Sequence, residues 1–347
     1  MYKRQGIGYV KLGKPTEERH ILVEKGDATY QFGIDYLRDV WYSTSYLLDR
    51  KQSMNGCAKK RFENYKKQPL EFVFDKSFTG KLSQFGLNPD RRTPTGIKAA
   101  IIREKGTNGE REMAYMLYLA GFDVKDVTMT DLVSGRETLE DINFIVFCGG
   151  FSNSDVLGSA KGWAGAFLFN PKAKAALDNF YARKDTLSLG VCNGCQLMIE
   201  LNLINPDFTK KAKMLHNDSH KFESKFVGVT VPMNRSVMFG SLSGSKLGIW
   251  VAHGEGKFSL PYHEDKYNVV LKYSYDEYPG NPNGSDYSVA GLASPDGRHL
   301  AMMPHLERSC FPWQNAYYPA DRIKNDQITP WMEAFVNARK WIEMNKK

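Results

Sequence analysis

The residues best suited to nucleophilic chemistry lie in the heptapeptide GVCNGCQ, residues 190–196, which holds two cysteines three positions apart. A strand that runs through Gly-x-Cys-x-Gly into a helix is typical of a nucleophile elbow, with cysteine in place of serine. The turn is tight, so the residues two before and two after the nucleophile must be small, and both are glycines around Cys192. The helix N-terminus that follows favours a thiolate and supplies backbone N–H donors. The pattern predicts Cys192 as the nucleophile, the Asn193 N–H as an oxyanion donor, and Cys195 one turn into the helix, pointing away.

Three other interpretations of the cysteine pair stay open at this point. A structural zinc site needs about four ligands, usually from two such pairs, and the sequence holds no second Cys-x-x-Cys. A thioredoxin-like redox pair has no need for glycines two residues on either side of its first cysteine. Two inert, buried cysteines are the third possibility. Only the elbow accounts for the two glycines.

A cysteine nucleophile needs a base, and the base needs a residue that orients its ring. The segment MMPHLERS supplies both types, His305 and Glu307, directly after an expected strand. In an extended chain these two side chains project to the same side, so Glu307 can hold the His305 ring toward Cys192. His253, with Glu255 at the same spacing in AHGEG, is the main rival base. The remaining histidines stand in polar surroundings and are expected at the surface: His20, His216, His220, His263 and His299.

These side chains need a scaffold that brings the ends of separate strands together. From Gly96 onward, apolar strand segments alternate with helices, which is typical of βαβ units and a mostly parallel α/β sheet. The expected strands are IKAAIIRE, FDVKDVTM, NFIVFCGG and TLSLG, with a helix ended by Gly121 after the first and one long helix at 158–183 before the last. Strands later in the chain extend the sheet, and the helix PWMEAFVNARKWIEMNKK closes it.

The first 95 residues have a different pattern. Two β-prone runs around Gly26-Asp27 predict a hairpin, and two helices follow, the second ending near Pro69. Residues 78–95 are polar and interrupted by glycine and proline, which predicts a linker. A hairpin and two helices make a thin core, so we expect residues 1–77 to pack on something absent from the chain.

Composition limits the classes of partner and compartment. Residues 1–95 hold 18 Lys and Arg against 11 Asp and Glu, so this segment carries seven of the eight net positive charges. This excess of positive charge predicts a solvated face, or a surface that binds phosphate-bearing ligands or an acidic partner domain. No basic stripe with interleaved aromatic residues occurs, so no nucleic-acid partner is expected. No apolar run approaches the ~20 residues of a membrane span, and the start lacks a signal peptide, so we expect no membrane partner and a cytoplasmic location. Five sparse cysteines argue against a disulfide framework.

Together, GVCNGCQ and His305-x-Glu307 at the end of a late strand resemble the class I, triad-type glutamine amidotransferases. Over about residues 96–347 the chain is similar to the glutaminase domains of the phosphoribosylformylglycinamidine synthase family. Residues 1–95 resemble the last part of the ATP-dependent synthetase module in the large, single-chain members of that family. The stretches that narrow the resemblance are GGFSNSDVLGSAKGWA, NDSHKFESKF, HGEGKF, NPNGS, MMPHLERS and PWMEAFVNARKW.

The resemblance implies a flavodoxin-like α/β fold with helices on both faces of the sheet, preceded by a small α+β segment. It implies hydrolysis of L-glutamine at Cys192 through a γ-glutamyl thioester, with His305 as general base and acid and Glu307 orienting it. Gly150 would be the second oxyanion or substrate contact, and Gln196 stands at the family's glutamine-binding position. Phe222-Glu223 and His253 would belong to the glutamine pocket or a domain interface.

The resemblance also implies a division into a synthetase remnant at 1–77, a linker at 78–95 and a glutaminase domain at 96–347. The chain would be a C-terminal fragment, and Met1 would not be its native start. Its partner would be the missing synthetase module, which holds the ATP and Mg sites, so no cofactor and no metal are expected in this chain. There the released ammonia would convert formylglycinamide ribonucleotide into the amidine in purine biosynthesis.

The chain departs from the family pattern in two places. Leu306 stands between His305 and Glu307 where proline is common, which frees the backbone φ there. Residues 151–154, Phe-Ser-Asn-Ser, replace a frequent Tyr-Gly. The alternatives are another class I amidotransferase, a related cysteine hydrolase, or a silent interaction domain of the same fold. Because glutaminase domains of this kind are often nearly silent until the synthetase site is occupied, we expect low basal activity.

Overall fold

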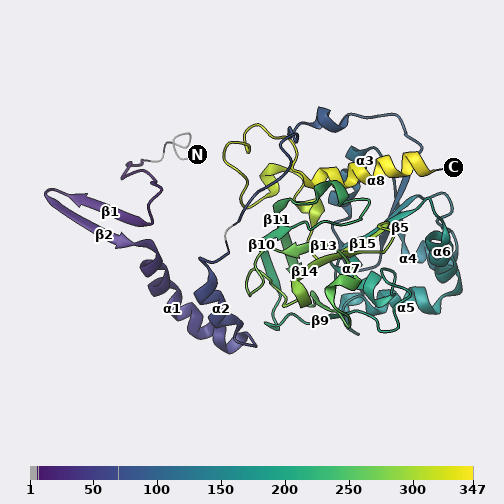
Figure 1. Cartoon of the computed structure of the whole chain (residues 1–347), viewed down its shortest axis with the longest axis horizontal. Helices are drawn as coiled ribbons and strands as arrows, with labels where there is room; N and C mark the ends of the chain where they lie inside the picture. The colour runs from purple at the N-terminus through teal and green to yellow at the C-terminus, as the bar shows by residue number, and fades with distance from the viewer. Residues whose placement is uncertain (1–5, 7, 69, 347) are drawn as a thin grey trace. The chain divides into compact units, whose positions relative to one another are not determined.

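The computed structural model describes residues 6, 8–68 and 70–346, so Met1 and Pro69 lie outside the described residues. The chain divides into two compact units, Met1–Gln52 and Ser53–Lys347. Figure 1 shows the secondary-structure elements of each unit with their labels. None of the described helices is long and apolar enough to cross a bilayer.

The first unit consists of a hairpin and a helix. Strands β1 (His20–Lys25) and β2 (Ala28–Gly33) pair antiparallel around Gly26-Asp27, so the predicted hairpin is confirmed. Helix α1 (Ile34–Gln52) follows directly, and Asp49 is its one buried residue. Its apolar side chains, Trp41 among them, are exposed. The unit therefore leaves most of its apolar surface uncovered.

The second unit is built on a nine-stranded sheet in the order β11-β10-β13-β14-β15-β8-β6-β3-β5. The last five strands of this order are mutually parallel, and the first four pair antiparallel with their neighbours. The parallel strands are β3 (Lys98–Arg103), β5 (Asp123–Thr128), β6 (Phe144–Phe147), β8 (Leu187–Val191) and β15 (His299–Met302). The antiparallel strands are β10 (Glu223–Thr230), β11 (Lys246–His253), β13 (Asn268–Tyr273) and β14 (Val289–Ala293).

This sheet confirms the α/β class but corrects its composition, because it is evenly mixed rather than mostly parallel. No α-helix lies between β10 and β15 in the described chain, so these strands connect without the crossover helix that a parallel neighbour requires. Strand β14 was not expected from the sequence. The parallel half is buried on both faces, which explains why β6 reads as the unbroken apolar run FIVF.

Helices cover both faces of the parallel half, as expected (Figure 1). On one face, α3 (Glu110–Ala120) packs against α8 (Trp331–Asn345). On the other face lie α4, α5, α6 and α7, which contact one another. This division follows from right-handed crossovers, because the step from β3 to β5 and the step from β6 to β8 run in opposite directions across the sheet. The bounds of the second group are Met129–Ser134, Lys161–Phe169, Pro171–Ala182 and Asn193–Glu200.

The helix predicted as one piece over 158–183 is two helices, α5 and α6. Asn170 ends the first and caps the second, its side chain accepting from the N–H groups of Lys172 and Ala173. Pro171 has no N–H to continue α5 and fits the first position of α6. The predicted stop of α3 is confirmed, because Gly121 has a left-handed φ of 99° and caps the last carbonyls.

The two compact units divide at residue 52, and residues 53–95 group with the second unit. Helix α2 (Cys57–Asn64) is shorter than expected, and Val73 bridges to Lys246 beside the sheet. Phe78 is only 3% exposed. The segment expected as a linker thus packs against the core through Phe78, which is buried, and Phe85, which is partly buried.

Short elements between the main strands and helices complete the unit. Two small ladders pair β4 (Thr107–Asn108) with β7 (Gly149–Gly150), and β9 (Lys213–Leu215) with β12 (Lys257–Ser259). The 3₁₀ turns are η2 (Leu82–Phe85), η3 (Ser152–Asp155), η4 (Gly240–Leu242), η5 (Glu264–Lys266), η6 (Asp286–Ser288), η7 (Leu306–Arg308) and η8 (Pro312–Gln314).

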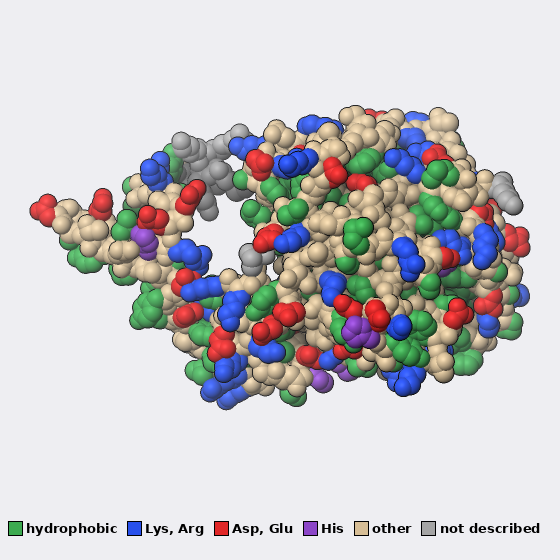
Figure 2. Space-filling view, viewed as in Figure 1, with side chains coloured by type: hydrophobic (Ala, Val, Ile, Leu, Met, Phe, Trp, Pro, Cys, Tyr) green, Lys and Arg blue, Asp and Glu red, His purple; other side chains and the backbone are tan. Residues whose placement is uncertain are grey.

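Acidic and basic side chains are interspersed on the face of the second unit seen in Figure 2. Many are paired across neighbouring elements, for example Lys98 with Asp141 and Arg103 with Asp126. Such mixing leaves no broad field of one sign on that face.

Candidate active site

The elbow has the strained geometry that its glycines predict. Strand β8 runs into Cys192, whose φ of 53° and ψ of −106° are unusual for a residue with a side chain, and α7 begins at Asn193. A Cβ on Gly190 would lie 2.5 Å from the Gly194 carbonyl oxygen, and a Cβ on Gly194 would lie 2.0 Å from that of Phe147. No larger residue fits either position without a shift of backbone.

The two cysteines of the motif have different environments. Cys192 is 5% exposed at the wall of a cavity, and its Sγ lies 3.5 Å from the carbonyl oxygen of Ala252. Cys195 is fully buried behind it, and burial raises the pKa of its thiol well above the usual range. The structure thus places Cys195 away from the cavity, as the sequence predicts.

The side chains of His305 and Glu307 contact each other close to Cys192. His305 Nδ1 donates to Glu307 Oε1 at 2.7 Å, and both side chains are buried. Burial opposes a charge on this ring, but charge interactions and hydrogen bonds with Glu307 and Cys192 raise the pKa of His305 to about 10. The arrangement favours a protonated His305 ring held between Glu307 and Cys192.

The backbone conformation that brings His305 and Glu307 together differs from the predicted one. His305 is extended, but Glu307 lies in the 3₁₀ turn η7 rather than in a continuing strand. The two side chains meet because the turn folds the carboxylate back under the ring. The structure brings the two side chains into contact, but through a turn and not through the extended geometry expected.

The strand pair β4–β7 holds the glycines that face the nucleophile. A Cβ on Gly149 would lie 2.8 Å from His305 Cε1 and 3.4 Å from Cys192 Cβ, so both side chains converge on this residue. Gly150 lines the cavity, with a φ of 119° that favours glycine. The N–H of Asn193, as the first residue of α7, has no partner within the helix. The backbone N–H groups of Asn193 and Gly150 are thus the two candidates for an oxyanion site.

The side chain of Asn193 adds a contact that sequence reasoning missed. Its Oδ1 accepts from the Ser152 N–H at 3.1 Å, and its Nδ2 donates to Gln196 Oε1 at 2.9 Å. Gln196 Nε2 in turn donates to the carbonyl of Glu255 at 2.8 Å. This chain of bonds ties η3, the elbow helix and the loop after β11 around one cavity.

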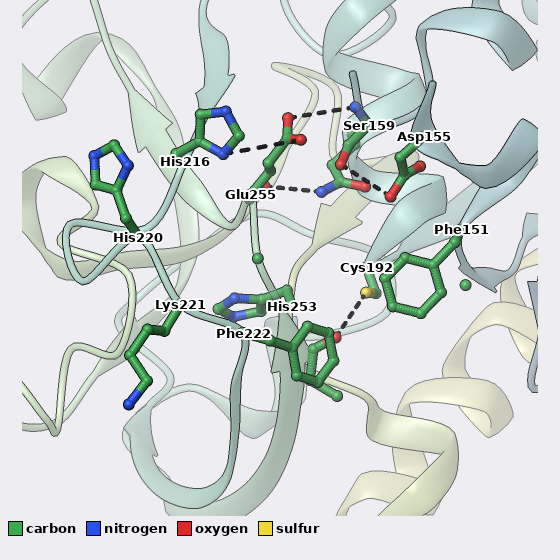
Figure 3. A pocket seen from close by; sticks show the side chains of 14 residues that line it. Phe151, Asp155, Ser159, Cys192, His216, His220, Lys221, Phe222, His253 and Glu255 are labelled. Carbon is green, nitrogen blue, oxygen red and sulfur yellow. Dashed lines mark hydrogen bonds and ion pairs between the residues drawn. The ribbon is translucent and has the colours of Figure 1, made fainter. Parts of the chain in front are cut away.

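The cavity encloses about 220 Å³ and opens beside Cys192 (Figure 3). Phe151 and Phe222 face each other near the sulfur, with ring centroids 5.9 Å apart. Glu223, by contrast, lies outside the cavity, where its Oε1 accepts from Tyr278 and Ser219. The expected role of the pair Phe222-Glu223 in the pocket therefore has structural support at Phe222.

His253, the rival base, is fully engaged by neutral partners. Its Nδ1 donates to Asn217 Oδ1 at 3.2 Å, and its Nε2 accepts from Asn283 Nδ2 at 3.5 Å. Burial lowers the pKa of His253 to about 3, and the charge of His305 acts in the same direction. Glu255, its expected orienter, turns away from it and accepts from the Ser159 N–H. The geometry favours His305 as the base.

An acidic corner of the cavity was also missed from the sequence. Asp155, Ser159 and Glu255 lie together there, and Ser159 Oγ donates to Asp155 Oδ2 at 3.4 Å (Figure 3). Burial and the nearby Glu255 charge raise the pKa of Asp155, whose Oδ1 is buried without a partner. The stretches quoted for the family resemblance contain these residues but give no role for them.

Of the five histidines expected at the surface, His263 is exposed and His20 is half-buried. His216 and His220 are exposed, but both line the cavity, and His216 lies 3.9 Å from Glu255. His299 is buried, which corrects the prediction, and its Nδ1 lies 2.9 Å from Ser188 Oγ.

A model of the CobB/CobQ-like glutamine amidotransferase domain matches residues 96–342. The chain belongs to this amidotransferase family. A probable phosphoribosylformylglycinamidine synthase of Arabidopsis thaliana is 40% identical over 334 residues, 89% of this chain and 23% of that protein. The phosphoribosylformylglycinamidine synthase of Homo sapiens is 38% identical over 375 residues, 98% of this chain and 27% of that protein. The chain thus spans about a quarter of the length of these relatives.

Among solved structures, PurLQS from Thermotoga maritima matches this amidotransferase chain with a TM-score of 0.53 and 27% identity. The match covers 72% of this chain and 99% of that one. The resemblance to the amidotransferase region of phosphoribosylformylglycinamidine synthases, stated from the motifs, is confirmed.

Proposed function

We propose that this chain is the glutaminase part of a phosphoribosylformylglycinamidine synthase and hydrolyses the side-chain amide of L-glutamine at Cys192. The observation that carries the proposal is the buried 2.7 Å contact of His305 with Glu307 beside the Cys192 elbow, at the wall of a small cavity. A cysteine, a histidine and an orienting carboxylate are the parts that acyl transfer through a thioester needs.

In the first half of the reaction, the Cys192 thiolate attacks the amide carbon of glutamine and forms a carbon–sulfur bond. The carbonyl electron pair moves to oxygen, where the N–H groups of Asn193 and Gly150 stabilise it. His305 gives its Nε2 proton to the amide nitrogen. The carbon–nitrogen bond then breaks, releasing ammonia and leaving a γ-glutamyl thioester with a neutral His305.

In the second half, His305 takes a proton from a water molecule as that water attacks the thioester carbonyl. The carbon–sulfur bond breaks, and glutamate leaves. Cys192 returns to thiolate and His305 to imidazolium, and the new γ-carboxyl group loses its proton to solvent. The net reaction consumes one water and yields glutamate, ammonia and one proton. Throughout, Glu307 keeps the proton on Nδ1 and thereby leaves Nε2 for the chemistry.

The acidic corner suits the other end of the substrate. With the amide carbon at Cys192, we place the α-ammonium of glutamine against Asp155 and Glu255, which line the same cavity. Asp155 Oδ1 has no protein partner, so an ammonium donor would satisfy it. Gln196 supports this wall through its bond to the Glu255 carbonyl.

The remaining steps concern the longer protein. We propose that the ammonia passes to a synthetase module, which uses ATP and Mg to convert formylglycinamide ribonucleotide into formylglycinamidine ribonucleotide in purine biosynthesis. Residues 1–77 would be the end of that module, 78–95 the connection and 96–347 the glutaminase domain. The partner is then the missing module, and the compartment we propose is the cytoplasm.

The test is covalent labelling with a glutamine-like diazo-ketone, followed by intact mass and peptide mapping. We expect one adduct on Cys192, blocked by free glutamine and absent in Cys192→Ser. Cys195→Ser is the matched control and should label like the unchanged chain. Labelling of Cys195, of several cysteines or of none would overturn the proposal and leave a silent domain of the same fold.

A further inference from the structure

Arg308 lies outside the cavity and contacts both Glu307 and strand β4. Arg308 Nη2 donates to Asn108 Oδ1 at 2.8 Å. Arg308 Nε lies 3.8 Å from Glu307 Oε1 and 3.6 Å from Glu112 Oε1. The distance to Glu307 is too long for a hydrogen bond. Arg308 therefore acts on that carboxylate through its charge and by fixing the position of the turn η7.

Asn108 connects this arginine to the nucleophile. In the β4–β7 ladder Asn108 pairs with Gly149, and the neighbouring pair includes Gly150. Gly149 is the residue on which the side chains of His305 and Cys192 converge. A single hydrogen bond from Arg308 to Asn108 therefore fixes the turn η7 against the strand pair β4–β7, which also positions Gly150, the proposed oxyanion contact.

The turn η7, which carries Glu307, needs such a restraint. Glu307 Oε2 is buried and has no hydrogen-bond partner among the described residues, so its carboxylate is held by the hydrogen bond of Oε1 to His305. The torsion that rotates a carboxylate is soft, and Leu306 allows φ more freedom than proline would. Gly109 leaves room for the arginine, since a Cβ there would lie 3.2 Å from Arg308 Nη2.

We infer that Arg308 is a positioning residue, which holds Glu307 under His305 by tying η7 through Asn108 to the β4–β7 strand pair. The inference rests on the proposed function for its catalytic consequence. The positioning itself depends only on the contacts of Arg308.

The test compares Arg308→Met, Arg308→Lys, Asn108→Ala and the double variant Arg308→Met/Asn108→Ala. The kinetics of diazo-ketone labelling at Cys192 give a maximal rate and a half-saturating concentration. We expect Arg308→Met and Asn108→Ala each to lower the maximal rate about tenfold, as small misplacements near reacting groups do. The half-saturating concentration should stay unchanged, and the double variant should be no slower than either single one. Arg308→Lys should recover only part of the rate, because lysine keeps the charge but not the forked geometry.

A second readout does not need the reaction. The Nδ1 proton of His305, in a short bond to Glu307, should give a low-field proton resonance that Glu307→Gln removes. We expect Arg308→Met to shift or broaden it. Arg339→Met is the matched control, since Arg339 is equally exposed at 30%, pairs with Glu343 on α8, and lies beside Gly121 at the opposite end of α3 from Glu112. This control should change neither readout.

Three results would overturn the inference: unchanged labelling and resonance in Arg308→Met, full recovery in Arg308→Lys, or a double variant whose losses multiply. A wild-type chain that takes no label at Cys192, but whose His305 resonance shifts in Arg308→Met, would overturn the proposed function and leave the positioning role in place.

Discussion

The side-chain amide of Gln196 donates to the backbone carbonyl of Glu255, with 2.8 Å between nitrogen and oxygen. Its oxygen accepts from Asn193, so both ends of this amide hold the cavity wall together. The residue at the family's glutamine-binding position thus has a structural task beside any contact with substrate. The wall that it supports carries the carboxylate of Glu255, which remains available to a cationic group.

Replacement of Glu255 should therefore affect recognition of the α-ammonium group. We expect Glu255→Gln to lower kcat/KM for glutamine about tenfold or more, the loss typical of a charge-assisted hydrogen bond. Hydrolysis of glutaric acid monoamide, which lacks the ammonium, should change little. Glu264→Gln, at a surface pair with Lys272, is the control. An equal loss for both substrates would contradict the proposed orientation.

The raised pKa of His305 gives stability a defined pH dependence. The folded pKa is about 10 against 6.5 for the ordinary ring, so the unfolded chain releases this proton first as the pH rises. The stabilisation is fully present below about pH 6.5 and is lost as the pH rises through about 10. Urea unfolding should show the free-energy difference between the protein and Glu307→Gln shrinking over this range. A constant difference would argue against a protonated His305.

His299 should act in the opposite direction. Burial, with the charge of Arg298, lowers the pKa of His299 from 6.5 to about 4, so the unfolded chain binds a proton that the folded chain does not. Stability should fall as the pH drops from about 6.5 to 4, by up to about 1.4 kcal/mol per pH unit from this group. His299→Gln should flatten that slope, and His263→Gln at an exposed site should not. Equal slopes in all three proteins would contradict this account.

The elbow glycines offer a steric test. In Gly194→Ala the new Cβ would lie 2.0 Å from the carbonyl oxygen of Phe147, so β6 and α7 must separate. We expect a loss of about 3 kcal/mol or more in the free energy of unfolding, at or above the usual cost of overpacking. Gly240→Ala is the control, because nothing lies within 4 Å of its added Cβ. Equal stability of the two variants would show that the elbow can relax.

Features that depend on local sterics were readable in the sequence. The elbow needs glycines two residues on either side of Cys192, and that spacing is visible without a structure. The hairpin around Gly26-Asp27 and the stop at Gly121 follow from the conformational freedom of glycine in the same way. The break at Asn170-Pro171 was also readable, because proline cannot continue a helix, but the apolar period of the whole stretch masked it.

Other features were decided by contacts between distant parts of the chain. His253 is buried and bonded to Asn217 and Asn283, and burial lowers its pKa. His299 is buried beside Ser188, which lies 111 positions away. Alternating apolar residues predict strands but not their directions, so the antiparallel half of the sheet was not visible. The sequence by itself determined the reactive groups and the turn that presents Cys192. Only the tertiary structure decided which histidine can hold a proton, because burial and neighbouring charges set a pKa and both come from packing.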